Sequence, residues 1–301
     1  MTEAARVGFV GIGNMGWPMA ACLVAAGHAL IVHDNRVERT ARFVADYGGT
    51  AASSLAALAA ASDIVIAILP TSEQVEQVLF GPGDALGPHL RHGSVVIDMT
   101  SGQPARTIAL GERLAALGIA MMDAPVSGGV ARAETGDLAI MTGGEEKVIA
   151  RCLPLLEKMG STILRIGPLG SAQAMKALNN LVSAGGFLIG IEALLIGKRF
   201  GLDPETMVDI LNASSGSNNS TQKKFRRFVL SQRYDSGFAL ALMVKDLGIA
   251  LELAQQAGLD VPFAAQCREL WAEASATLGI DADHTELARA AERRAGVALG
   301  E

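Results

Sequence analysis

The chain has 301 residues, half of them hydrophobic, which is enough for two domains of roughly 150 residues with a substantial core. Its formal net charge of −6 excludes the broad basic surface that nucleic acid requires. We interpret the one basic cluster, Lys223 to Arg227, as a solvated helix face. The cysteines, Cys22, Cys152 and Cys267, lack the paired spacing of metal ligands and are typical of a reducing compartment. A cytoplasmic protein is therefore expected.

The first half alternates β-branched runs with helical patterns, which is typical of a parallel sheet covered by helices. Strands are expected at residues 6–10, 29–34, 63–70, 94–100, 119–125, 138–144 and 162–167. The intervening segments, such as residues 72–81 and 107–118, space their apolar residues for helices and end in glycine. We predict a doubly wound α/β domain of the Rossmann type over residues 1–166.

Beyond residue 166 the pattern is helical, with polar or glycine-containing breaks at residues 201–204, 214–220 and 257–262. A long helix over residues 171–200 opens an all-helical domain that we place at residues 167–301. Its most apolar part, residues 181–197, is short for a bilayer span and carries Glu192, so a buried helix is favoured over a membrane segment. We expect no cleavable signal, since the N-terminus lacks a basic region followed by an apolar core.

Gly11, Gly13 and Gly16 form a G-x-G-x-x-G motif directly after a predicted strand and at the start of a predicted helix. In this context the first glycine permits a tight turn, the second lets the backbone approach a pyrophosphate, and the third lets helix and strand pack closely. Backbone N–H groups and the helix dipole then face the phosphates. The motif predicts dinucleotide binding.

Asp34 ends the second predicted strand, about 20 residues after the glycines, where a carboxylate accepts hydrogen bonds from the adenosine ribose. Its charge would repel the 2′-phosphate of NADP, which favours NAD as the cofactor. Arg36 and Arg39 lie close enough in sequence to offset that repulsion, so NADP stays open as the alternative.

A second candidate stretch follows a predicted strand at Asp123. There Ser127, Gly128 and Gly129 form a turn of small residues at a strand's carboxyl end, the edge at which open α/β sheets bind ligands. A hydroxyl and backbone N–H groups in such a turn can bind an anion, most simply a carboxylate. The alternative is a plain loop.

A third candidate lies on the long predicted helix, where Lys176 and Asn180 are four residues apart and share one face, with Gln173 one turn before. A lysine on a helix rich in Ala, Met and Leu either reaches water along its apolar stem or serves chemistry. If it faces a substrate, burial and the positive nicotinamide lower its pKa toward working pH, so that it can exchange protons.

Four motifs in this order, GFVGIGNMG, DAPVSGG, KALNN and KDLGIALELA, resemble those of the β-hydroxyacid dehydrogenase family, which includes 3-hydroxyisobutyrate dehydrogenase and tartronate semialdehyde reductase. The resemblance covers essentially the whole chain. It implies an NAD(P)-dependent oxidoreductase that transfers hydride between the nicotinamide and a small β-hydroxy carboxylate. It also implies a homodimer or homotetramer formed through the helical domain, whose apolar helices are hard to cover within one copy.

The resemblance assigns roles to residues of the second and third candidate stretches. It implies that Lys176 is the general acid or base, that Asn180 orients the substrate, and that Ser127, Gly128 and Gly129 hold the substrate carboxylate. It further implies a position near the substrate and the nicotinamide for Lys245, with Asp246 supporting that lysine.

The resemblance also adds three residues to the cofactor site. Asn14 and Met15 match the phosphate-binding loop, and Thr100 matches a position that borders the nicotinamide. A strand-end cap is an equally good interpretation of Thr100. No metal site is predicted, since the histidines are scattered at His28, His33, His89, His92 and His284.

Rival functions share this architecture. Imine reductases usually lack the lysine retained here as Lys176. Decarboxylating phosphogluconate dehydrogenases have a longer chain and a substrate site that binds phosphate. A non-catalytic cofactor-binding module is a third alternative, against which the presence of both Lys176 and Asn180 argues. Substrate choice should depend on residues 214–220, on Lys245 and on the neighbours of Ser127. Hydroxyisobutyrate, tartronate semialdehyde, serine, threonate and sulfonated analogues all stay open.

Overall fold

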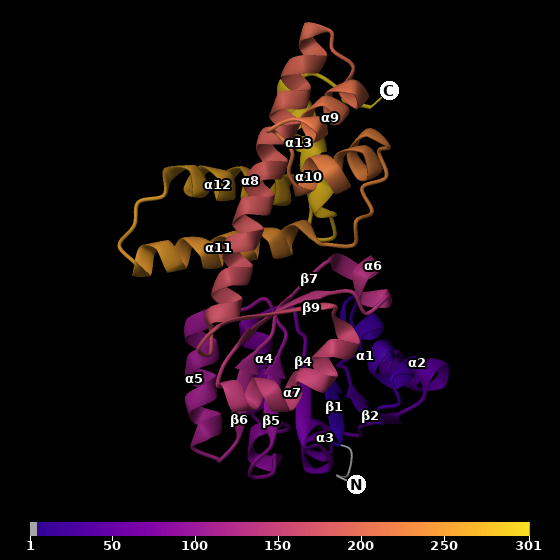
Figure 1. Cartoon of the computed structure of the whole chain (residues 1–301), viewed down its shortest axis with the longest axis vertical. Coiled ribbons are helices and arrows are strands. Elements are labelled where there is room, and N and C mark those ends of the chain that lie inside the picture. The colour runs from indigo at the N-terminus through magenta and orange to yellow at the C-terminus, as the bar shows by residue number, and fades with distance from the viewer. Residues whose placement is uncertain (1–4, 301) are drawn as a thin grey trace. The chain divides into compact units, whose positions relative to one another are not determined.

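The structure is a computed structural model that describes residues 5–300. By its internal contacts the chain divides into two compact units, Met1–Lys176 and Ala177–Glu301 (Figure 1). Helix α8 (Ser171–Phe200) begins in the first unit and ends in the second. The domain boundary predicted between residues 166 and 167 stays a prediction, because α8 continues without a break from the first unit into the second.

The first unit is built on a nine-stranded sheet in the order β3-β2-β1-β4-β5-β6-β8-β7, with β9 paired to β8. All seven predicted strands are present, and the structure adds the two-residue strands β3 and β7, which are too short to give a hydropathy pattern. The strands are β1 (Val7–Val10), β2 (Leu30–His33), β3 (Thr50–Ala51), β4 (Ile64–Ala67), β5 (Val95–Asp98), β6 (Ala120–Asp123), β7 (Val126–Ser127), β8 (Ala139–Gly143) and β9 (Thr162–Gly167).

The strands up to β6 are parallel, but β8 is antiparallel to both β6 and β7. The expected parallel sheet is therefore confirmed for most of its strand pairs, and β8 departs from it at its pairs with β6 and β7. A parallel partner needs a crossover of a dozen or more residues, whereas the six-residue helix α6 (Gly129–Glu134) brings the chain straight back from β7 into β8. The sheet is therefore doubly wound and mixed at one edge.

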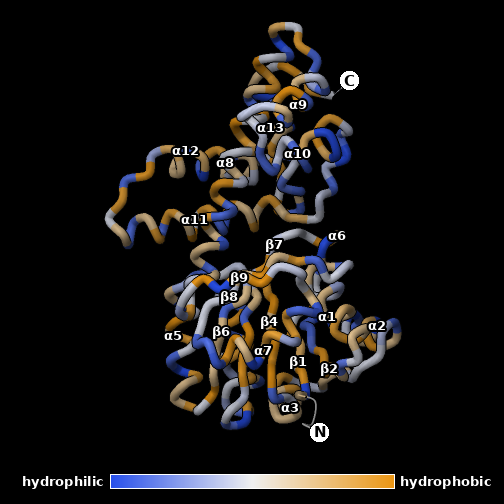
Figure 2. The backbone as a smooth tube through the Cα atoms, in the orientation of Figure 1, coloured by the Kyte–Doolittle hydropathy of each residue, from blue (hydrophilic) through white to orange (hydrophobic). Residues whose placement is uncertain are grey.

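Helices cover both faces of the sheet, so successive residues of a strand belong to different buried clusters. Phe9 of β1 and Ile97 of β5 belong to one buried cluster, whereas their neighbours Val10 and Val96 belong to another on the opposite face. The strands are correspondingly hydrophobic in Figure 2. The helices and turns are α1 (Gly16–Ala25), α2 (Val37–Tyr47), α3 (Leu55–Ala61), α4 (Ser72–Phe80), η1 (Gly87–His89), α5 (Pro104–Ala115), α6 and α7 (Glu146–Met159).

The second unit is helical, as predicted. Its elements after α8 are α9 (Pro204–Ala213), α10 (Asn219–Lys223), the π-helical turn η2 (Phe225–Leu230), α11 (Leu240–Gln256), α12 (Pro262–Leu278), η3 (His284–Glu286) and α13 (Leu287–Ala295). The predicted breaks contain helix caps: Asp203 accepts the N–H of Thr206, and Asn218 accepts that of Thr221. Aromatic rings fill the core, with Phe187 against both Phe225 and Trp271.

Among the described residues, α8 is the one helix long and apolar enough to cross a membrane by length and composition. Of its most apolar window, 56% is buried within the protein. The core helix of a globular protein passes the same test, so the helix carries no argument for a membrane segment.

Candidate active site

The glycine-rich loop joins β1 to α1, and two of its glycines, Gly11 and Gly16, leave no room for a side chain. Gly11 has φ of +97°, and a Cβ added there would lie 2.3 Å from the carbonyl oxygen of Ile68. A Cβ on Gly16 would lie 1.8 Å from the carbonyl oxygen of Gly11, so helix and strand approach too closely for any other residue. A Cβ on Gly13 would meet nothing nearer than Arg39 Nη1 at 3.9 Å, which leaves open space beside the loop.

The start of α1 offers donors to that space. Its N-cap residue is Met15, and no side chain caps the helix there. In the first turn Trp17 donates its N–H to the carbonyl oxygen of Gly13 and Pro18 has no N–H, so Gly16 supplies the N–H that can face an anion. Asn14 is exposed, whereas Met15 is half-buried against the core of the sheet. The open space at Gly13 and the uncapped helix start together fit the pyrophosphate of a dinucleotide.

Asp34 follows β2 at the same edge of the sheet and is 9% exposed. One carboxylate oxygen accepts the backbone N–H of Ile12 at 2.8 Å, and the other accepts that of Arg36 at 2.9 Å. The carboxylate therefore braces the glycine-rich loop. Since each oxygen has a second lone pair, both can still accept a hydroxyl of a ribose.

Strand β5 ends in Asp98, a residue that the sequence analysis did not single out. Its carboxylate accepts the backbone N–H of Thr100 at 2.9 Å and is 1% exposed. Burial raises its pKa to about 6, an effect that hydrogen bonds from Thr100 and Gln173 partly offset. Thr100 is buried too, and its hydroxyl oxygen accepts the N–H of Leu69 at 3.0 Å, so it ties the ends of β4 and β5 together.

Strand β6 ends in Asp123. Burial raises the pKa of its carboxyl group, and hydrogen bonds from backbone N–H groups offset only part of that rise. Its role as an acceptor for α8 was also missed. The signal that could have found both acids is the position: an aspartate directly after a run of buried β-branched or methionine residues needs a specific partner.

Ser127, Gly128 and Gly129 form the predicted small-residue turn between β7 and α6. Gly128 and Gly129 have φ of +140° and +72°, values that favour glycine. Ser127 is half-buried, and both glycines are exposed. The turn thus presents a hydroxyl and accessible backbone to a ligand.

Lys176 and Asn180 lie on α8, one turn apart. Within the helical unit, Asn180 donates from Nδ2 to Asp246 Oδ2 at 2.5 Å, and Lys245 Nζ lies 3.2 Å from Asp246 Oδ1. Asp246 is 1% exposed and Asn180 is 6% exposed. The structure therefore places Asn180, Lys245 and Asp246 in one cluster, which joins the KALNN motif to the KDLGIALELA motif.

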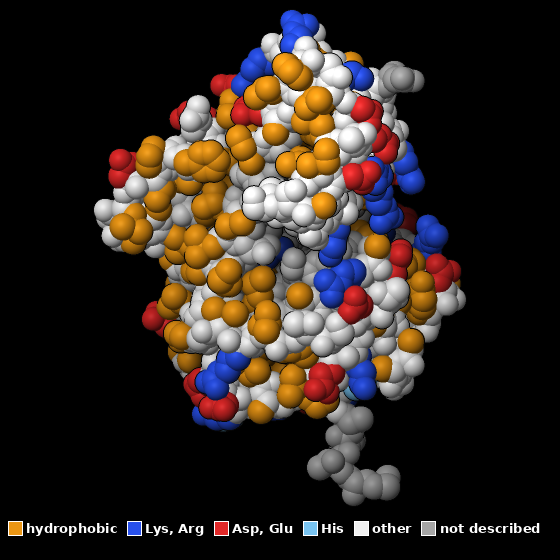
Figure 3. Space-filling view, turned by 45° about the horizontal axis from the view of Figure 1, so that its top comes forward, with side chains coloured by type: hydrophobic (Ala, Val, Ile, Leu, Met, Phe, Trp, Pro, Cys, Tyr) orange, Lys and Arg blue, Asp and Glu red, His pale blue; other side chains and the backbone are white. Residues whose placement is uncertain are grey.

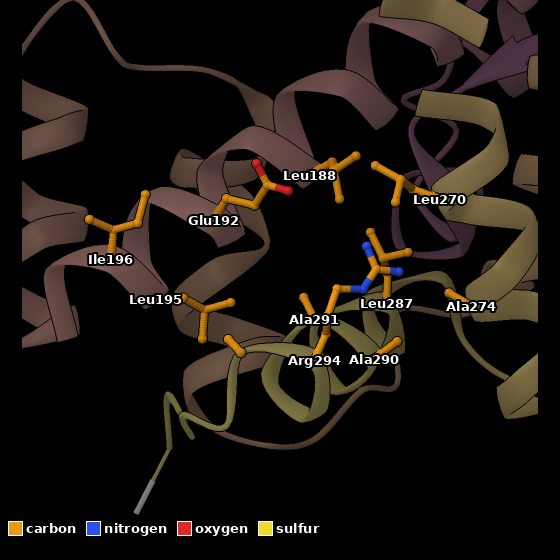
Figure 4. A pocket seen from close by; sticks show the side chains of 11 residues that line it. Leu188, Glu192, Leu195, Ile196, Leu270, Ala274, Leu287, Ala290, Ala291 and Arg294 are labelled. Carbon is orange, nitrogen blue, oxygen red and sulfur yellow. The ribbon is translucent and has the colours of Figure 1, made fainter. Parts of the chain in front are cut away.

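Two other features bear on the site. In the part of the chain that the structure describes, no group of three or more His, Cys, Asp or Glu residues is arranged to hold a metal ion. A cavity of about 310 Å³ lies between α8, α12 and α13, with Glu192 and Arg294 among largely apolar side chains (Figure 4). Its lining includes none of the predicted site residues.

Comparisons with known proteins agree with these motifs. The family model of the NAD-binding domain of 6-phosphogluconate dehydrogenase matches residues 6–167, and that of NADP-dependent 3-hydroxyisobutyrate dehydrogenase matches residues 170–291. The chain is 35% identical to 2-(hydroxymethyl)glutarate dehydrogenase of Eubacterium barkeri over 99% of both chains. It is 34% identical to 2-hydroxy-3-oxopropionate reductase of Escherichia coli over 95% of this chain and 97% of that one.

The chain therefore belongs to the β-hydroxyacid dehydrogenase family. A solved structure of Mycobacterium tuberculosis 3-hydroxyisobutyrate dehydrogenase with L-serine is 28% identical, with a TM-score of 0.87 over 96% of this chain and 99% of that one. An imine reductase of Streptomyces aurantiacus is 20% identical with a TM-score of 0.64, a likeness that extends to the fold alone. The protein is an NAD(P)-dependent oxidoreductase that acts on hydroxyl groups, as the sequence motifs predict.

Proposed function

We propose that the protein interconverts a small β-hydroxy carboxylate and the corresponding semialdehyde, with Lys176 as the proton-transfer group. A bound nicotinamide would supply the hydride acceptor for the carbinol carbon in the oxidative direction and the hydride donor in the reductive one. Lys176 takes the hydroxyl proton during oxidation. In reduction its ammonium donates that proton and stabilises the oxygen as negative charge develops on it.

The substrate carboxylate is assigned to the turn of Ser127, Gly128 and Gly129. The serine hydroxyl and the backbone N–H groups of the turn are suitable donors for an anion. Asn180 orients the substrate, and Lys245 adds a positive charge near the nicotinamide. The observation that supports these two roles is the buried Asp246, which accepts from Asn180 and faces Lys245.

The proposed cofactor is NAD in preference to NADP. The support for this choice is the buried carboxylate of Asp34 at the end of β2, where it would repel a 2′-phosphate. Arg39 keeps NADP as the alternative, since its Nη1 lies 3.9 Å from the Cβ position at Gly13.

Turnover with a panel of substrates tests the proposal. In the oxidative direction, nicotinamide absorbance is followed with NAD or NADP and with 3-hydroxyisobutyrate, 2-(hydroxymethyl)glutarate, serine, threonate or sulfonated analogues as the substrate. In the reductive direction it is followed with NADH or NADPH and with the semialdehydes, including tartronate semialdehyde. We expect Lys176→Ala to lower kcat by about 10²-fold or more on the accepted substrate, with little change in the dissociation constant of NADH. Lys176→Arg is the matched variant: it keeps the charge but cannot release a proton near neutral pH. Near-normal turnover in either variant would contradict the role of Lys176.

We also propose that the protein forms a homodimer or homotetramer through its helical unit. Val182, Ile189 and Ile196 of α8 are 76%, 54% and 72% exposed and recur every seven residues, the spacing of a helix-packing seam. Figure 3 shows further hydrophobic side chains on the surface of this unit. A second copy would cover them.

The proposed location is the cytoplasm. The three cysteines are free, and burial raises the pKa of Cys152 and of Cys267 to about 11, so neither thiol is set up for disulfide exchange. Unpaired thiols of this kind suit a reducing compartment.

A further inference from the structure

A network of five buried polar side chains lies where β5 and β6 end and α8 begins. Its members are Asp98, Thr100, Thr107, Asp123 and Gln173, each at most 1% exposed. Buried polar groups are costly unless their hydrogen bonds are made, so a network of this size fixes the relative positions of its members. All five belong to the first unit, as does Lys176.

Asp123 caps the start of α8 from a strand. Its Oδ1 accepts the N–H of Gly170 and its Oδ2 that of Gln173, both at 2.8 Å. A carboxylate at a helix N-terminus satisfies orphan donors and complements the helix dipole. Gly143 on the adjacent strand makes room for it, because a Cβ there would lie 2.3 Å from Asp123 Oδ1. The cap fixes the first turn of α8 against the end of β6.

Gln173 connects the same helical turn to β5 and α5 through its side chain. Its Nε2 donates to Asp98 Oδ2 at 3.0 Å and to the carbonyl oxygen of Thr100 at 3.3 Å, while its Oε1 accepts from Thr107 at 2.6 Å. Both amide hydrogens and the amide oxygen are therefore used. Gly102 leaves space for this side chain, since a Cβ there would lie 3.0 Å from Nε2.

Lys176 follows Gln173 by one helical turn. We propose that Gln173 is a positioning residue that sets the rotation of α8 and so holds the Lys176 ammonium at the reacting oxygen. This inference rests on the proposed role of Lys176. A small rotation of the helix moves the end of a lysine side chain further than it moves the backbone, and a displacement of about 1 Å at a reacting group can cost about 10²-fold in rate.

The variant Gln173→Met tests the proposal, since methionine has a similar length and makes none of the three hydrogen bonds. We expect kcat to fall by about 10-fold or more, whereas the dissociation constant of NADH stays within about twofold. The deciding measurement is a double-mutant cycle with Lys176→Ala. If Gln173 acts through the lysine, Gln173→Met has no further effect on the residual rate of Lys176→Ala.

Ser62→Ala is the matched control, because Ser62 is equally buried in the same unit and its hydroxyl donates at 2.7 Å to Leu58 within α3. It should lower Tm without changing kcat. Should Gln173→Met not fold, Thr107→Val removes one hydrogen bond of the glutamine. It should lower kcat by less than the roughly 10-fold expected for Gln173→Met, and this decrease should be absent in the Lys176→Ala background.

Two outcomes overturn the proposal: an unchanged kcat in the glutamine variant, or rate losses that multiply in the double variant. The first would assign the network to stability alone, and the second would show that Gln173 affects the rate by a route other than Lys176. These outcomes are distinct from failure of the proposed function, which is read from Lys176→Ala by itself: near-normal turnover there removes the lysine from the chemistry whatever Gln173 does.

Discussion

The side-chain amide of Asn180 donates a 2.5 Å hydrogen bond to the carboxylate of Asp246. The aspartate is almost fully buried and also faces Lys245 at 3.2 Å, so one acid orients an amide and an ammonium at once. This relationship connects two motifs that are more than sixty residues apart in sequence.

The first prediction concerns that acid. Asp246→Asn keeps the shape of the side chain but removes the negative charge that faces Lys245 and leaves one acceptor oxygen for two donors, Lys245 and Asn180. We expect KM for the acid substrate to rise by about 10-fold, corresponding to about 1.4 kcal/mol of lost binding, as measured by steady-state kinetics. Asp209→Asn, an exposed carboxylate of the same unit that pairs with Arg226, is the control and should leave KM unchanged.

The second prediction concerns cofactor choice. Asp34→Ala should weaken NAD more than NADP, because only NADP carries the phosphate that the carboxylate repels. The same change removes the acceptor for the N–H groups of Ile12 and Arg36, so Tm should fall as well. Fluorescence titration with NADH and NADPH measures the first effect. Asp46→Ala on α2, whose carboxylate is exposed beside Arg42, should change neither. Equal losses for both cofactors would show that Asp34 does not discriminate between them.

The third prediction is a pH dependence of stability. Burial raises the pKa of Asp98 from the ordinary aspartate value of 3.8 to about 6, so between these values the folded state binds a proton more tightly than the unfolded chain does. This group therefore adds stability as the pH falls from about 6 toward 4 and loses it as the pH rises through 6.

Denaturant unfolding of the wild type and of Asp98→Asn at several pH values checks the sign. The asparagine does not titrate, so the stability of the wild type relative to the variant should increase as the pH is lowered over that interval. The charge of Asp123 contributes to the raised pKa of Asp98, so in Asp123→Asn the stability change that Asp98 causes should occur at lower pH than in the wild type. A difference between wild type and Asp98→Asn that is constant with pH would contradict the assignment.

The fourth prediction concerns assembly. Ile196→Glu places a charge in the apolar seam of α8 and should shift the protein toward smaller species in sedimentation velocity. Ile210 on α9 is 60% exposed but lies outside the seam, so Ile210→Glu should leave the oligomer intact. A wild-type protein that sediments as a monomer at all concentrations would refute the proposed oligomer.

Local patterns in the sequence were sufficient for most of the fold. Apolar, largely β-branched runs predicted the seven longer strands, and the helical spacing predicted α8 with the bounds that the structure gives. The glycine-rich loop could also be interpreted residue by residue, because its geometry depends on neighbours within one strand–turn–helix unit.

The antiparallel course of β8 and the network around Gln173 could not be predicted in this way. Both depend on which segments meet in space. The bond from Gln173 to Asp98 spans 75 residues, and nothing in the local sequence of either residue specifies the other. The roles of Lys176, Ser127 and Lys245 stay predictions, since they concern a substrate and not the fold.

Gly143 and Asp123 are opposite each other on β8 and β6, and the space left by the glycine is occupied by the aspartate's carboxylate. Any side chain at residue 143 would displace that carboxylate and leave the start of α8 uncapped. We therefore expect the two positions to be constrained jointly in evolution. Across relatives, a change at one should be accompanied by a change at the other, and a single substitution at residue 143 should be tolerated only where residue 123 has already become smaller.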